Sequence, residues 1–160
     1  MTTTVSSEEG TARVASELAA RLSVGQIVCL RGDLGAGKTT FTRHLLAAFG
    51  SPARVSSPTF TLVHEYEGGR VNVAHLDCYR LSGEDDFLAS GLDDYLNSEE
   101  WLTLIEWPER IERLLPETRV EVELTPSPNN GEPEVRKITI RHISPKPGGE
   151  GASDGQGVIC

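Results

Sequence analysis

The octapeptide GDLGAGKT at residues 32–39 decides how the rest of the chain is interpreted. Glycines at three of its positions have no Cβ, so consecutive backbone N–H groups can turn inward around a phosphate. Lys38 adds a positive charge suited to the space between the β- and γ-phosphates of a nucleotide, and the Thr39 hydroxyl is suited to ligating Mg²⁺. The stretch therefore predicts a phosphate-binding loop.

The flanking residues match the context that such a loop requires. Residues 26–31, QIVCLR, have the composition of a short buried strand, and residues 38–49 are typical of a helix that ends at Gly50. Strand, glycine loop and helix N-terminus occur in the required order. A glycine-rich surface turn is the alternative interpretation, but such a turn has no need for Lys-Thr at the start of a helix.

Length and composition indicate one domain. The chain has 160 residues with 38% hydrophobic content, which suits a single core. We expect a domain over residues 1–143 and a Gly/Pro/Ser-rich, disordered tail over 144–160. Residues 1–10 lack a signal-peptide pattern, and the longest apolar run near the N-terminus is only four residues, so we expect a cytoplasmic protein without a membrane segment. The three cysteines, at positions 29, 78 and 160, are widely spaced and predict reduced thiols, with the first two buried.

The charge balance argues against direct nucleic-acid binding. The chain carries 15 Lys and Arg against 24 Asp and Glu, for a formal net charge of -9. A negative surface is repelled by a phosphate backbone unless a basic patch overrides it, and the sequence contains no cluster of basic residues.

Together with the phosphate-binding loop, hydrophobic periodicity and turn residues predict an α/β fold, namely a P-loop NTPase-like three-layer sandwich with a mixed, mostly parallel sheet flanked by helices. A capping-box pattern at residues 6–9 predicts a first helix that continues to about Ser23. Two prolines bracket residues 51–59, which we expect to form a loop near the phosphates. The further elements are predicted as strands at 60–67 and 70–76 joined at Gly68-Gly69, two short helices within 83–96, a strand at 102–105, a short helix from Pro108, and strands at 120–124 and 135–142.

Two carboxylates end apolar strands. Asp77 follows residues 73–76 and Glu106 follows residues 102–105, which places both at the edge of the sheet expected to hold the phosphates. Such acids hold the metal shell or orient the nucleophile. Either acid taken singly could instead cap the following turn, but this alternative is less favoured for both together. Thr59 has a hydroxyl that could reach Mg²⁺ or the γ-phosphate, or simply satisfy loop backbone. His75 and Tyr79 are interpreted as packing residues.

Four motifs together resemble one family. GDLGAGKTT at 32–40, SPTFTLV at 57–63, HLDCYRL at 75–81 and IEWPE at 105–109 occur in the order typical of the bacterial TsaE (YjeE) family, and the resemblance covers residues 8–142. It implies a small ATPase needed to make N6-threonylcarbamoyladenosine beside the anticodon of tRNA. It further implies action with TsaB and TsaD, of which TsaD carries out the transfer, and contact with tRNA only through that complex.

The resemblance also implies residue roles, with ATP and Mg²⁺ as the cofactors. It implies a catalytic group of Asp77 as water-orienting residue or base, Lys38, and Thr59 in a mobile switch segment. It implies that Thr39 and Glu106 bind Mg²⁺ and that Trp107 lies in a region linked to activity. Residues 131–136 approach the nucleotide in relatives. The nucleotide-binding residues are Glu8, near the base, with Leu34, Gly35, Ala36, Gly37, Lys38, Thr39 and Thr40.

Three other functions remain open at this point. A small-molecule P-loop kinase shares the loop but needs an acceptor pocket and an arginine-rich lid, whereas the arginines here are scattered. A GTPase needs an Asn-Lys-x-Asp motif, which is absent from the sequence. A module that binds ATP only as structural glue would keep normal tRNA modification when replacement of Asp77 or Glu106 abolishes hydrolysis but not binding.

Overall fold

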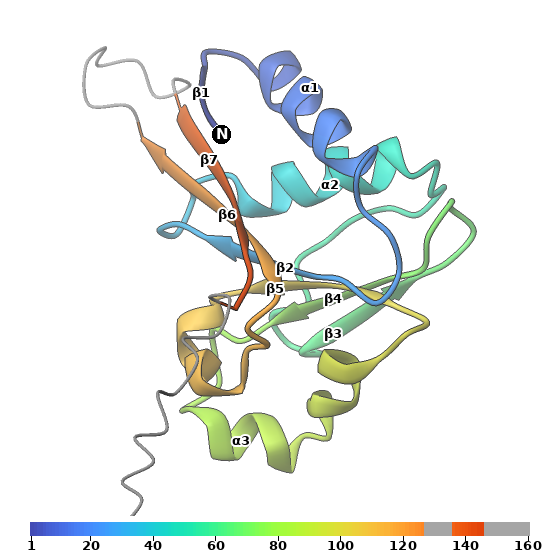
Figure 1. Cartoon of the computed structure of the whole chain (residues 1–160), viewed down its shortest axis with the longest axis vertical. Helices are drawn as coiled ribbons and strands as arrows, with labels where there is room; N and C mark the ends of the chain where they lie inside the picture. Colours follow the sequence, from blue (N-terminus) through green and yellow to red (C-terminus); the bar gives the residue numbers. More distant parts are fainter. Residues whose placement is uncertain (127–135, 146–160) are drawn as a thin grey trace, which may run out of the picture.

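A single mixed sheet of seven strands organises the part of the chain that the computed structural model describes, residues 1–126 and 136–145 (Figure 1). The strands follow the order β1-β7-β6-β2-β5-β4-β3 across the sheet. Their bounds are β1 Thr2–Val5, β2 Ile27–Arg31, β3 Val63–Tyr66, β4 Val73–Asp77, β5 Leu102–Glu106, β6 Arg119–Pro126 and β7 Arg136–Ile143.

The strand directions confirm the predicted mixed sheet. Strands β6, β2, β5 and β4 are parallel neighbours, while β7 runs antiparallel to β6 and β3 antiparallel to β4. Since β1 pairs antiparallel with β7, it runs in the direction of the central four. Strand β1 was not predicted. The parallel centre brings the carboxyl ends of β2, β5 and β4 to one edge, where α/β sheets bind their ligands.

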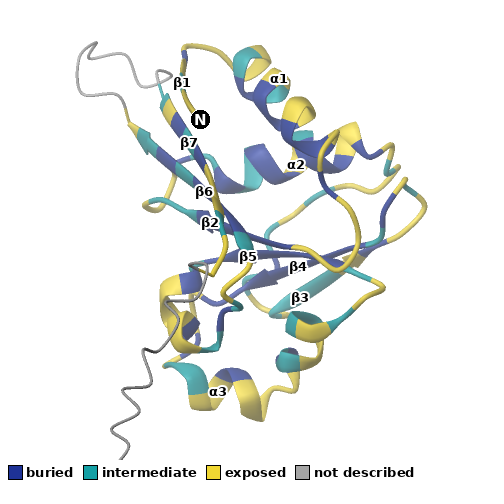
Figure 2. Cartoon of the chain, in the orientation of Figure 1, coloured by how far each residue is buried: buried dark blue, intermediate teal, exposed yellow. Residues whose placement is uncertain are grey.

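Helices cover both faces, which confirms the three-layer prediction. Helices α1 (Glu8–Ala19) and α2 (Lys38–Ala48) lie on one face, and α3 (Glu84–Ala89) with the 3₁₀ helices η1 (Leu92–Asn97) and η2 (Pro108–Leu114) lies on the other (Figure 1). Strand β2 shows how the layers form. Val28 and Leu30 join the hydrophobic cluster under α1 and α2, whereas Ile27 and Cys29 join the cluster under η2. Figure 2 shows buried residues along both faces.

Several element boundaries differ from prediction. Helix α1 ends at Ala19 rather than near Ser23, and its cap is Ser7, which accepts a hydrogen bond from the Gly10 N–H, so glycine stands where a capping box needs Glu. The expected hairpin is confirmed, but its strands are shorter. Leu62 has a left-handed φ of 66° and donates its N–H to Pro58, so β3 starts only at Val63.

The remaining elements agree with the sequence within one or two residues. Both short helices, the strand ending at Glu106, the helix at Pro108 and strands β6 and β7 are confirmed. The Asn129-Asn130-Gly131 connection and residues 146–160 lie outside the described residues. Within residues 1–126 and 136–145, every helix is too short or too polar to cross a membrane.

Cys29 and Cys78 are predicted to resist alkylation in the folded protein. Both are fully buried, and burial raises the pKa of each thiol to about 12, with Glu121 adding to the effect at Cys29 and Asp77 at Cys78. At a pH of about 8 only roughly one part in 10⁴ of such a thiol is the reactive thiolate. Peptide mapping after iodoacetamide treatment should find both unmodified in buffer and both modified in denaturant. Rapid modification in buffer would show that the hydrophobic cluster under η2, which contains both cysteines, is open.

Candidate functional site

The glycine loop has a geometry that only glycine allows. Gly32, Gly35 and Gly37 have φ angles of 148°, 79° and 101°, in the region that L side chains rarely adopt. A Cβ on Gly32 would lie 2.5 Å from the carbonyl oxygen of Leu124 in β6. Gly37 precedes α2 and gives it no side-chain cap, so the first N–H groups of the helix are left for a ligand.

Lys38 folds back over this loop. Its Nζ donates to the carbonyl oxygens of Gly32 at 2.6 Å and Asp33 at 3.0 Å, and it lies 4.1 Å from the ring centroid of Trp107. Burial lowers the pKa of Lys38, while nearby carboxylates, Glu106 first among them, act to raise it. The cation is therefore partly desolvated and held at the loop by neutral acceptors, which an incoming phosphate can replace.

Asp77 is held by the proline-bracketed segment. Its Oδ2 accepts hydrogen bonds from the hydroxyls of Ser57 at 2.8 Å and Thr59 at 3.2 Å, and its Oδ1 accepts from the N–H of Tyr79 at 2.9 Å. The residue is only 4% exposed. The prediction that residues 51–59 lie near the phosphate loop fits this placement.

Glu106 lies beside Asp77 because the two residues are register partners in the parallel strands β5 and β4. Its Oε1 is 2.9 Å from the Nε2 of His75, and both residues are buried. Two strand-end carboxylates thus meet at the edge of the sheet where the phosphate loop begins.

These groups surround one cavity of about 390 Å³. Nine of the eleven residues predicted from the sequence line it, namely Leu34, Gly35, Gly37, Lys38, Thr39, Thr40, Thr59, Asp77 and Glu106. The other two lie elsewhere. Ala36 is buried behind the loop, and Glu8 contacts α2, with its Oε1 3.1 Å from the Nε2 of His44 and 3.6 Å from Arg43.

Four further residues of the described ranges line the cavity: Ser57, Tyr79, Trp107 and Arg136. The family resemblance pointed to Trp107 and to the region that ends at Arg136, whereas Ser57 and Tyr79 had no predicted role in the site. Tyr79 was interpreted as a packing residue but is 42% exposed at the cavity, with its ring 4.9 Å from that of Trp107. The guanidinium of Arg136 lies against Gly37, where an added Cβ would be 3.3 Å away. Trp107 itself has a left-handed backbone with φ of 58°, a strain often found at functional sites.

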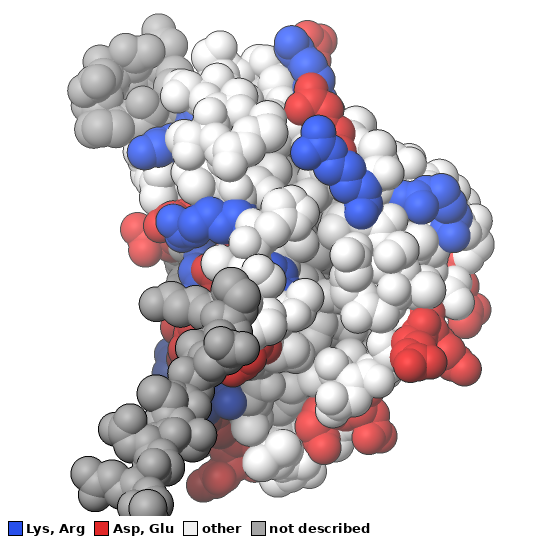
Figure 3. Space-filling view, in the orientation of Figure 1, with Lys and Arg blue, Asp and Glu red and all other residues white. Residues whose placement is uncertain are grey.

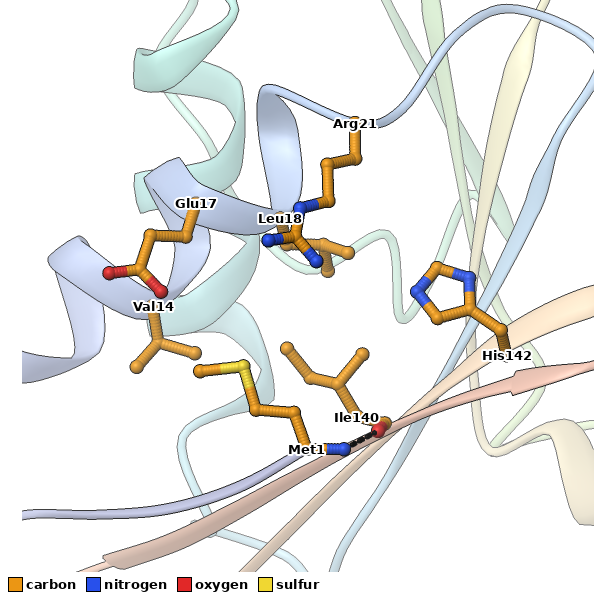
Figure 4. A pocket seen from close by; sticks show the side chains of 7 residues that line it. All are labelled: Met1, Val14, Glu17, Leu18, Arg21, Ile140 and His142. Carbon is orange, nitrogen blue, oxygen red and sulfur yellow. Dashed lines mark hydrogen bonds between the residues drawn. The ribbon is translucent and has the colours of Figure 1, made fainter.

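Another cavity, of about 220 Å³, lies between α1 and β7 (Figure 4). Its lining is mainly apolar, and the N-terminal amine of Met1 closes one side by donating to the carbonyl of Ile140 at 2.8 Å. No residue of the phosphate loop lines it, and neither strand-end carboxylate does. Polar and charged groups that converge mark the larger cavity as the candidate site.

The larger cavity suits Mg²⁺ that arrives with a polyphosphate. Thr39 and Glu106 offer oxygen ligands at its wall. No group of three or more His, Cys, Asp or Glu side chains that could hold a metal occurs in the part of the chain that the structure describes. Mg²⁺ is ordinarily bound by one or two protein oxygens together with substrate phosphates and water rather than by a protein cage, so the residues present fit this ion.

The strand, loop and helix arrangement, with carboxylates at neighbouring strand ends, places the chain among α/β proteins with a P-loop NTPase-like fold.

Comparison with known proteins then gives the family. The model for "Threonylcarbamoyl adenosine biosynthesis protein TsaE" matches residues 5–137, and the chain belongs to this family. The tRNA threonylcarbamoyladenosine biosynthesis protein TsaE of Bacillus subtilis (strain 168) is 41% identical over 119 residues, 74% of this chain and 73% of that protein. TsaE of Rickettsia bellii is 42% identical over 76% of this chain and 84% of that protein. The crystal structure of Bacillus subtilis YdiB matches with a TM-score of 0.74 and 30% identity, covering 90% and 86% of the two chains. The family role is tRNA threonylcarbamoyladenosine biosynthesis.

Replacing Gly32 by Ala is predicted to destabilise the protein more than replacing Gly50 by Ala. Both glycines have positive φ, but an added Cβ at Gly50 meets open space, whereas at Gly32 it meets the Leu124 carbonyl. Gly50→Ala should cost about 1 kcal/mol of unfolding free energy, and Gly32→Ala should cost about 1–3 kcal/mol more. Urea unfolding without nucleotide measures both. Equal losses would contradict the close approach of loop and β6.

Proposed function

We propose that this chain binds ATP with Mg²⁺ in the larger cavity and hydrolyses it as an accessory ATPase of tRNA threonylcarbamoyladenosine synthesis. The observation that supports this most directly is that Lys38, Thr39, Asp77 and Glu106 converge on one cavity at the N-terminus of α2. Membership in the TsaE family supports the pathway.

Binding would use the backbone of the loop and two side chains. The N–H groups of the loop and of the first turn of α2 bind the phosphate oxygens, and Lys38 exchanges its carbonyl acceptors for the β- and γ-phosphates. Thr39 and Glu106 would hold Mg²⁺. When bound, the ion neutralises charge on the phosphate oxygens. Arg136, against Gly37, adds a positive charge on the β7 side.

Hydrolysis would depend on Asp77. The carboxylate orients a water and accepts its proton while the water oxygen bonds to the γ-phosphorus and the bond to the bridging oxygen breaks, which leaves ADP and phosphate. Its Oδ2 must first exchange the Ser57 and Thr59 hydroxyls for that water. A phosphate loop without an arginine supplied by a partner can turn over as slowly as on the order of 10⁻³ per second, so the isolated protein is expected to be slow.

Within the cytoplasm the chain would act with TsaB and TsaD and reach tRNA only through them. Its net charge is -9. On the face shown in Figure 3, acidic side chains gather toward the α3 and η1 end, where the first turns carry Glu84, Asp85, Asp86, Asp93 and Asp94. Such a surface repels a phosphate backbone, which favours a partner as the tRNA-binding subunit.

Asp77→Asn and Glu106→Gln are predicted to abolish hydrolysis while the fold remains. Each change keeps the size of the side chain and removes the charge, so steady-state phosphate release should fall at least about 100-fold. Glu123→Gln, which alters a surface carboxylate paired with Arg141, is the matched control and should keep the rate of the unaltered protein. The measurement is the rate of phosphate release from labelled ATP, with and without TsaB and TsaD. Undiminished hydrolysis in both site variants would refute the assignment.

Omission of this chain from a reconstituted system is predicted to stop tRNA modification after few turnovers. The system contains TsaB, TsaD, tRNA and a source of the threonylcarbamoyl group, and modified nucleoside is counted per TsaD molecule. The chain should restore continued turnover, and its Asp77→Asn variant should not. If Asp77→Asn restores turnover while hydrolysing nothing, ATP acts only as structural glue.

A further inference from the structure

A buried histidine lies directly beneath the two carboxylates. Val73, His75 and Asp77 alternate onto the same face of β4, the face that α1 and α2 cover, because successive strand residues point to opposite sides. His75 is 0% exposed. Its neighbour in β5 is Leu104, and the next pair toward the cavity is Asp77 and Glu106. An apolar side chain would fill this position without the desolvation that an imidazole suffers.

Only one of the two ring nitrogens of His75 has a hydrogen-bond partner in the described residues. Its Nε2 lies 2.9 Å from Oε1 of Glu106. Its Nδ1 is buried and has no hydrogen-bond partner among residues 1–126 and 136–145. A buried histidine with a purely structural role would be expected to form hydrogen bonds through both ring nitrogens. Within the described part of the chain, His75 forms one only through Nε2. Glu106 also has one side-chain atom without a hydrogen-bond partner, because no protein group in the described ranges donates to its Oε2. Glu106 lines the cavity.

We infer that His75 is a positioning residue that donates from Nε2 to Oε1 of Glu106 and so leaves Oε2 directed at the cavity for Mg²⁺. This inference rests on the proposed function, and it assigns His75 a role beyond the packing expected from the sequence. Outer partners of this kind orient a ligating carboxylate, and their removal typically costs about 10–100-fold in metal affinity. The Tyr66 ring, 6.3 Å from that of His75 between centroids, packs beside it without a hydrogen bond to it.

The test measures how strongly Mg²⁺ tightens the binding of a non-hydrolysable ATP analogue, as the ratio of Kd without and with the ion. His75→Leu should keep the Mg²⁺-free Kd, which reports the loop, and should lower the ratio roughly tenfold. His75→Gln carries an amide near the position of Nε2 and should recover most of the ratio. His75→Asn is too short to reach Glu106, so it should behave as His75→Leu and replaces it if the leucine variant does not fold.

The matched control is Thr103→Val. This change removes the hydrogen bond that the buried Thr103 of β5 donates to the Tyr95 carbonyl, and it should leave the ratio unchanged. A second comparison uses Glu106→Gln, in which adding His75→Leu should lower the ratio no further.

Two failures can be told apart. If the unaltered protein binds the analogue in neither condition, the proposed function is wrong. If the unaltered protein shows tightening by Mg²⁺ and His75→Leu and His75→Asn show the same ratio, or if His75→Gln is as poor as they are, the inference about His75 is wrong while the proposed function stands.

Discussion

The register between β4 and β5 is the constraint on which the site depends. It pairs Asp77 with Glu106, and the register between β2 and β5 pairs Leu30 with the same Glu106. Both acids and the start of the phosphate loop therefore leave the sheet at one edge. A slip of one residue would turn a strand's side chains to the other face, which puts apolar Leu76 where Asp77 belongs and moves the acid toward η2.

Contacts from distant elements then hold the loop on this edge. Gly32 lies so close to Leu124 that β6 limits its movement. Arg31, the last residue of β2, contacts Glu121 of β6 at 3.1 Å and Glu112 of η2 at 2.7 Å. Burial alone would raise the pKa of Glu121, but hydrogen bonds from Arg31 and Arg119 hold this pKa below its ordinary value. Glu112 is half-exposed, whereas Glu121 is buried. Through Arg31 the two ion pairs join η2, which follows Trp107, and β6 to the strand that precedes the loop.

Local patterns carried most of the prediction, and long-range contacts account for what it missed. The loop, Asp77 and Glu106 could be identified because strand, turn and helix residues stand together in the sequence. Strand β1 could not, since Thr2 pairs with Thr139 and its TTTV sequence is largely polar. The family resemblance implied only that residues 131–136 approach the nucleotide, and the contact of Arg136 with Gly37 depends on the pairing of β7 with β6. His75 was interpreted as a packing residue because the sequence does not show its contact with Glu106, which lies 31 residues away along the chain.

Nearly every reactive group of the site already has a protein partner. Lys38 is bonded to loop carbonyls, Oδ2 of Asp77 to Ser57 and Thr59, and Oε1 of Glu106 to His75. In the proposed function, ATP must replace the first two sets of contacts, whereas the third persists as support. Replacing the hydroxyls on Asp77 frees residues 57–59, because these bonds tie the segment to β4. The position of that segment would thus report whether the nucleotide is bound, which is what a partner needs in order to sense the state of an ATPase.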